Sequence, residues 1–152
     1  MTEVVANQPN TLPRAREEFI RLTNEDTTGA ERTRLLAVLD ALIAWSQARP
    51  KELQFKTSET KQAAVTFEWV ATKETLWSAL PARGQAPRLT LVPRAAQLLS
   101  EEQRQLATDT LNAHSREQIL PGDRLRIGFG ALKNPEARAA ILSLLDKLVV
   151  RS

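Results

Sequence analysis

The segment from Ala63 to Arg94 constrains the fold of this chain most, because it contains three runs with the two-residue period of β-strands. In the first run the apolar residues Val65, Phe67 and Trp69 alternate with polar ones, the pattern of a strand with one buried face. The short connections favour antiparallel neighbours, since a parallel pair needs a crossover of about a dozen residues or more. The segment therefore predicts a three-strand antiparallel meander over residues 63–93.

The second run leaves the direction of one tryptophan open. Trp77 lies on the parity opposite to Leu76 and Leu80, so either the tryptophan or the two leucines face outward. An outward Trp77 would be available to a ligand, whereas an inward Trp77 would be covered by a helix. Residues 81–87 contain Pro and Gly, and we predict that they form the turn to the third strand.

The flanking segments carry start signals for helices and one further alternating run. Capping boxes are present at Thr28 with Glu31 and at Ser100 with Gln103, and Asn134-Pro135 combines an N-cap with a proline at the first helical position. The predicted helices cover residues 11–24, 28–48, 100–113 and 136–150, and the further strands cover 53–56 and 124–130. We therefore predict an α+β fold with a mainly antiparallel sheet of four to five strands, packed with N-terminal, middle and C-terminal helices.

The chain length and composition are those of one globular domain. A chain of 152 residues buries about two thirds of its unfolded surface, enough for a core. We expect residues 1–10 to be a mobile tail and residues 11–152 to form a single domain. The N-terminus lacks an apolar signal region, and no stretch approaches the ~18 apolar residues of a membrane span. We expect a cytoplasmic protein without a membrane partner.

Patterns for catalysis and metal binding are weak. Without cysteine and with His114 as the one histidine, the chain cannot assemble a zinc site, and no G-x-S-x-G elbow accompanies that histidine. The five glycines form no phosphate-cradling loop. Metal-dependent nucleases place an acidic residue beside an acid-x-lysine pair, for which Glu59-Thr-Lys61 and Gln54-Phe-Lys56 are candidates without an evident acidic partner. We expect no catalytic residue, no metal and no cofactor.

Basic residues are concentrated in the strand region. Residues 49–94 hold eight Lys or Arg against four Glu, a net charge of +4, whereas residues 1–48 carry −2 and residues 95–152 carry +1. Arginine suits phosphate binding, although an arginine-rich genome would give the same excess. Aromatic residues interleave with these charges, as on surfaces that stack bases and follow phosphates. The predicted nucleic-acid contacts are Lys61, Lys73, Trp77, Arg83, Arg88 and Arg94.

Three functions follow from these features, in descending order. The first is a non-enzymatic domain that binds DNA or RNA through Lys and Arg of the meander. The second is a protein–protein interaction or homodimerisation module, because the segments 35–45 and 141–150 hold more apolar residues than one buried helix face requires. The same surplus of apolar residues would also be explained by a sheet packed between two layers of helices, without a second protein. The third is a metal-dependent nuclease-like enzyme.

Overall fold

The computed structural model describes residues 12–26, 29–56, 65–82, 85–115, 118–119 and 124–149. Within these residues the chain forms a five-stranded antiparallel sheet and six helices, which confirms the predicted α+β fold. The strands are β1 (Leu53–Phe55), β2 (Val65–Trp69), β3 (Thr75–Ala82), β4 (Gln85–Leu91) and β5 (Leu125–Gly128). The helices are α2 (Leu12–Asp26), α3 (Gly29–Gln47), α4 (Ala95–Leu98), α5 (Glu101–His114), α6 (Phe129–Leu132) and α7 (Pro135–Val149).

The strands pair in sequence order, β1-β2-β3-β4-β5, and every pair is antiparallel. The predicted meander is β2, β3 and β4, with β1 and β5 added at its two edges. One prediction here is wrong: much of the expected turn 81–87 is strand, since Ala82 pairs with Gln85. The register shift between Leu80 and Ala82 explains how Pro81 is accommodated, because proline has no N–H for the ladder and is tolerated at such irregularities.

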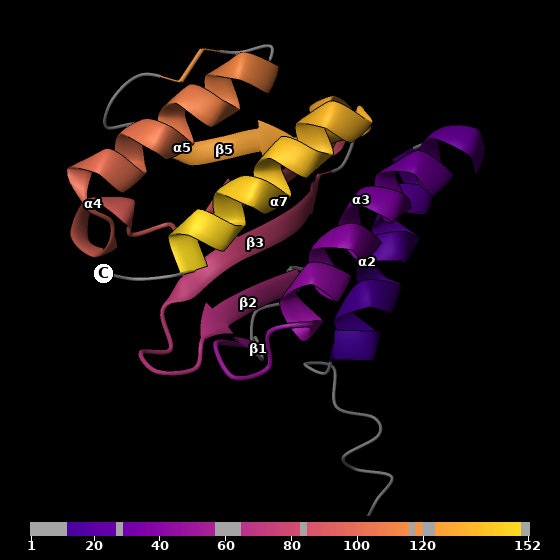
Figure 1. The fold of residues 1–152 in the computed structure, drawn as a ribbon. Coiled ribbons are helices and arrows are strands. Elements are labelled where there is room, and N and C mark those ends of the chain that lie inside the picture. Colours follow the sequence, from indigo (N-terminus) through magenta and orange to yellow (C-terminus); the bar gives the residue numbers. More distant parts are fainter. Residues whose placement is uncertain are drawn as a thin grey trace, which may run out of the picture.

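One face of the sheet is covered by helices. Figure 1 shows α3, α5 and α7 lying in front of the strands, with α2 beside α3. Alternating strand residues on this side are buried, as the two-residue period predicts. These core-facing strand residues are Leu53, Val65, Phe67, Trp69, Trp77, Ala79, Leu89, Leu91, Leu125 and Ile127.

A β-bulge decides the direction of Trp77. The register between β2 and β3 shifts at Phe67/Glu68, so that Phe67 pairs with Trp77 while Glu68 pairs with Thr75. Leu76 is the extra residue, and an extra residue lets two consecutive side chains point to one side. Both Leu76 and Trp77 are consequently buried, and the Trp77 ring stacks on Phe67 with centroids 5.3 Å apart. The inward alternative for Trp77 is the one observed.

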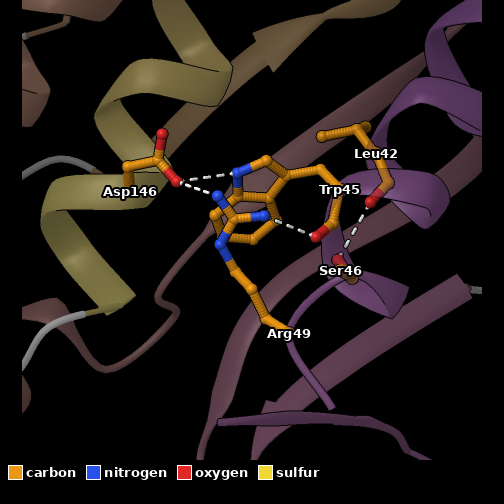
Figure 2. Close-up of polar contacts among 5 residues, drawn as sticks. All are labelled: Leu42, Trp45, Ser46, Arg49 and Asp146. Atoms are coloured by element: carbon orange, nitrogen blue, oxygen red, sulfur yellow. Dashed lines mark hydrogen bonds and ion pairs between the residues drawn. The ribbon is translucent and has the colours of Figure 1, made fainter. Parts of the chain in front are cut away.

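All three tryptophans donate hydrogen bonds to the helix layer. Trp77 Nε1 bonds to Ser46 Oγ at 2.8 Å, and Trp69 Nε1 bonds to the carbonyl oxygen of Val149 at 3.1 Å. Trp45 Nε1 bonds to Asp146 Oδ1 at 2.9 Å, which joins α3 to α7 (Figure 2). Indole N–H groups need a partner when they are buried, so these contacts fix how the helices sit on the sheet.

Arg49 completes the contact between α3 and α7. Its guanidinium carbon lies 4.1 Å from the centroid of the Trp45 ring, while Nη1 donates to the Trp45 carbonyl oxygen at 2.8 Å and Nη2 to Asp146 (Figure 2). We call Trp45, Arg49 and Asp146 the helix clamp. A second link, between α2 and α3, is the paired hydrogen bonding of Arg16 to Asp40, which raises the pKa of the Arg16 guanidinium.

Two predicted helix starts are confirmed. The hydroxyl of Ser100 accepts from the Gln103 amide at 3.1 Å, and the Gln103 side chain accepts from the Ser100 amide at 3.0 Å. Asn134 Oδ1 accepts from the Glu136 amide at 2.8 Å. The capping box at Thr28 and the expected tail 1–10 lie outside the described residues.

The predicted strand 124–130 is shorter than expected. The strand ends at Gly128, and Phe129 begins the short helix α6. This turn buries Phe129 completely and brings its ring to 5.7 Å from the ring of Phe19 on α2, measured between centroids. Burial of a large aromatic ring against a second helix offsets the loss of two further strand residues.

Candidate functional site

The strand positions that alternate with the core residues form a second face of the sheet, which we call the polar face. Its side chains are hydroxyl, amide and charged groups, with one leucine, and most of them are half-buried or exposed. The polar face comprises Gln54, Lys56, Thr66, Glu68, Thr75, Ser78, Leu80, Arg88, Thr90, Arg124 and Arg126.

Five of these residues form a line across the sheet, one directly after β1 and one on each of β2, β3, β4 and β5. Thr66 is opposite Ser78, Ser78 is opposite Thr90, and Thr90 is opposite Arg126. Lys56 continues the line beside β1, since its amide donates to the Thr66 carbonyl oxygen at 2.9 Å. We call these five residues the cross-strand row. With neighbouring strands about 4.8 Å apart, its two ends are separated by about 19 Å.

The middle of the cross-strand row consists of hydroxyl groups. Thr66 Oγ1 and Ser78 Oγ are 2.9 Å apart and share a hydrogen bond, and Thr90 follows on the next strand. Each hydroxyl has one proton and two lone pairs, so this bond leaves acceptor capacity on both residues and a free proton on the one that accepts. The row therefore presents hydrogen-bond acceptors together with hydroxyl protons, which suit sugar hydroxyls, amides and phosphate oxygens.

The ends of the row are cationic. Lys56 and Arg126 are exposed at opposite ends, and Arg88 lies diagonally next to Arg126, because Arg88 pairs with Gly128. Arg124 is exposed two residues before Arg126 and has the same parity. The β4–β5 side of the polar face thus combines three arginines, and their planar donor groups match the geometry of phosphate.

Glu68 is the one carboxylate among the described strand residues on this face. Glu68 is only 7% exposed. Gln54, which pairs with Glu68 from β1, donates a hydrogen bond of 2.6 Å from its Nε2 to Glu68 Oε2. Burial and the hydrogen bond from Gln54 weaken the repulsion that the Glu68 carboxylate would exert on an anionic ligand at the surface. The exposed charges on the described part of the polar face are positive.

The structure separates the predicted contact residues. Arg88 lies on the polar face, next to the cross-strand row. Lys73 is exposed in the connection between β2 and β3, and Arg94 is exposed after β4 with its Nη1 2.5 Å from Glu74 Oε1. Lys61 and Arg83 lie outside the described residues.

Trp77 must be removed from the set of contact residues. It is 0% exposed, with one ring face against Phe67 and its nitrogen bonded to Ser46. A base stacks only on an aromatic face that solvent can reach. Its place in that set required the outward alternative, which the β-bulge excludes because it places Trp77 in the core.

The predicted contact set contains no member of the cross-strand row: Lys56 was singled out only as part of a nuclease candidate, and Thr66, Ser78, Thr90 and Arg126 were missed altogether. Each stands at a polar position of an alternating strand, which is a signal for solvent exposure and nothing more specific. Their alignment depends on the register of three strand pairs, and register cannot be read from single strands.

The structure also clarifies the catalytic candidates. Gln54 and Lys56 share the polar face, and Glu68 is the acidic neighbour that Gln54-Phe-Lys56 lacked in sequence. Within the described part of the chain, no group of three or more His, Asp or Glu side chains is placed to hold a metal ion. His114 is the last residue of α5 and is half-buried. The nuclease function stays a prediction, for which the polar face offers one carboxylate, Glu68, and one lysine, Lys56.

No family model, no curated protein and no solved structure matches this chain. None of the helices in the described ranges has the length and apolar content needed to cross a membrane. What the protein binds is therefore inferred from the chemistry of its surface.

Proposed function

We propose that this domain is a non-enzymatic module that binds nucleic acid through its polar face. The observation that carries the proposal is the cross-strand row, with hydroxyl groups in its middle and the cations Lys56 and Arg126 at its ends. Half or more of the hydrogen bonds that proteins make to DNA go to phosphate and sugar, from Arg, Lys, Ser and Thr among others. Those four residue types make up the whole row.

Homodimerisation through α3 or α7 is less well supported. Most large apolar residues of both helices are buried within the chain itself, and only Leu36 on α3 and Leu142 on α7 are half-buried. Among the described residues the one large apolar side chain counted as exposed is Val70, at 37%. The apolar surplus that suggested a second partner is thus used inside the domain, and the polar face is the larger feature left for a ligand.

Fluorescence anisotropy with labelled DNA and RNA, at about 50 and 200 mM salt, tests the proposal. We expect a dissociation constant in the micromolar range or tighter at low salt and a steep loss of affinity at high salt, because phosphate contacts release counterions. Arg126→Ala should weaken binding to every sequence. Arg34→Ala and Arg104→Ala are matched controls, since both arginines are exposed on helices. The proposal is wrong if no nucleic acid binds at low salt.

A further inference from the structure

The aromatic residues of the whole chain are absent from the polar face. The chain has three Trp, four Phe and no Tyr, and all seven aromatic residues lie in described segments. Six of them are buried, and the seventh, Phe55, packs edge-on against Phe67 on the core side of the sheet. Single-stranded nucleic acid is held largely by stacking of its bases on exposed aromatic rings. The polar face has no such ring, which disfavours single strands as its partner.

The shape of the polar face also restricts the kind of double helix that fits it. The cross-strand row is about 19 Å long and its central side chains are short, being Thr and Ser. The major groove of B-DNA is about 12 Å wide and 8.5 Å deep, and it admits a helix or a two-stranded ribbon. A five-stranded sheet is too wide to enter that groove, so its hydroxyl groups would not reach the base edges.

The minor groove of A-form RNA fits these constraints better. This groove is wide and shallow, and it displays 2′-hydroxyl groups between two phosphate backbones. Hydroxyls of Thr66, Ser78 and Thr90 would face the 2′-hydroxyls, because a 2′-hydroxyl can donate to a lone pair of any of the three or accept a free proton from one of them. Lys56 at one end and Arg126 at the other would lie beside the backbones on the two sides of the groove.

We infer that the polar face binds double-stranded RNA without sequence preference, an inference that rests on the proposed function. The charge complementarity comes from Lys56, Arg88, Arg124 and Arg126, and the discrimination against DNA comes from the three hydroxyl groups in the row. Sequence preference is absent because the short side chains of the row contact sugars and phosphates, which carry no direct sequence information.

The test compares four probes of about 20 nucleotides or base pairs: double-stranded RNA, double-stranded DNA and the two single strands, each in two unrelated sequences. We expect double-stranded RNA to bind about fivefold or more tightly than the other three, equally for both sequences. Thr90→Val keeps the side-chain shape and removes the hydroxyl, and it should reduce the preference for RNA over DNA about threefold. Thr33→Val, at an exposed position of α3, is the control and should leave the preference unchanged.

The outcomes separate the two proposals. Equal or tighter binding of double-stranded DNA or of single strands would overturn the inference while leaving the proposed function intact. An RNA preference that survives both Thr90→Val and Ser78→Ala would show that the row does not read the 2′-hydroxyl, which also overturns it. Absence of binding to all four probes would overturn the proposed function itself.

Discussion

The indole nitrogen of Trp77 donates a hydrogen bond of 2.8 Å to the hydroxyl oxygen of Ser46, and both residues are fully buried. Ser46 in turn donates to the carbonyl oxygen of Leu42 at 2.9 Å, one turn earlier in α3 (Figure 2). The two bonds form a chain from β3 into α3 in which every polar hydrogen has an acceptor. A buried serine thus ties the centre of the sheet to the helix above it.

Ser46→Ala is expected to destabilise the protein by about 1–3 kcal/mol, because it leaves the Trp77 N–H buried without an acceptor. For a chain of this length that corresponds to a decrease in melting temperature of very roughly 2–4 °C per kcal/mol, measurable by circular dichroism. Thr33→Ala is the matched control: Thr33 makes the same kind of bond to the carbonyl four residues earlier, but at an exposed position.

A double-mutant cycle checks the cause of that loss. Trp77→Phe removes the donor, so Ser46→Ala should cost much less in the Trp77→Phe background than in the wild type. Equal costs in both backgrounds would contradict the assignment and would point to packing around Ser46 instead of the hydrogen bond.

Asp146→Ala is expected to lower the free energy of unfolding by about 1–2 kcal/mol, mainly through the lost acceptor of the Trp45 indole. The ion pair with Arg49 should contribute less, since the Asp146 side chain is 51% exposed and exposed pairs contribute about 0–1 kcal/mol. Asp146→Asn keeps an oxygen acceptor, so urea denaturation should show about half the loss or less.

Asp109→Ala provides the control for the helix clamp, because Asp109 accepts a bond from Gln105 on the exposed side of α5. Its effect should stay within about 0.5 kcal/mol. If Asp146→Asn costs as much as Asp146→Ala, the negative charge and not the acceptor oxygen stabilises the clamp.

The arrangement of strands and helices follows from local patterns, whereas the site depends on register. Alternation predicted β2, β3 and β4, and the Ser100 and Asn134 caps predicted the starts of two helices, because those signals act within a few residues. The burial of both Leu76 and Trp77 could not be predicted from these local signals. A bulge changes which side of the strand the following residues face, and its position is set by the pairing with β2. The same holds for Thr66 and Thr90, which become neighbours of Ser78 only through tertiary pairing.

Lys73→Gly is expected to stabilise the protein by about 0.5–1 kcal/mol, because Lys73 adopts the left-handed conformation, with φ of 60°, which costs a side-chain-bearing residue more than glycine. The amide of Lys73 also closes the turn by bonding to the Trp69 carbonyl oxygen at 2.8 Å, and glycine keeps that bond. Thermal denaturation measures the change.

Lys51→Gly is the control for that substitution. Lys51 is likewise exposed in a turn before a strand, but its φ is not positive. Glycine there should be neutral or destabilising by up to about 1 kcal/mol, because it adds backbone entropy to the unfolded chain without relieving a left-handed residue. Stabilisation by both substitutions would show that removal of a positive charge, and not backbone geometry, is responsible.

Arg126→Ala and Trp77→Phe are expected to have opposite effects on nucleic-acid binding and on stability. Arg126 is exposed, so its loss should leave the melting temperature nearly unchanged, weaken binding at low salt and reduce the slope of log K against log salt by about one. Trp77 is fully buried, so Trp77→Phe should lower the melting temperature and leave the affinity of the folded protein unchanged. Salt titrations below the melting temperature of both variants separate the two effects. Loss of affinity in folded Trp77→Phe with an unchanged Arg126→Ala would move the contact surface away from the polar face.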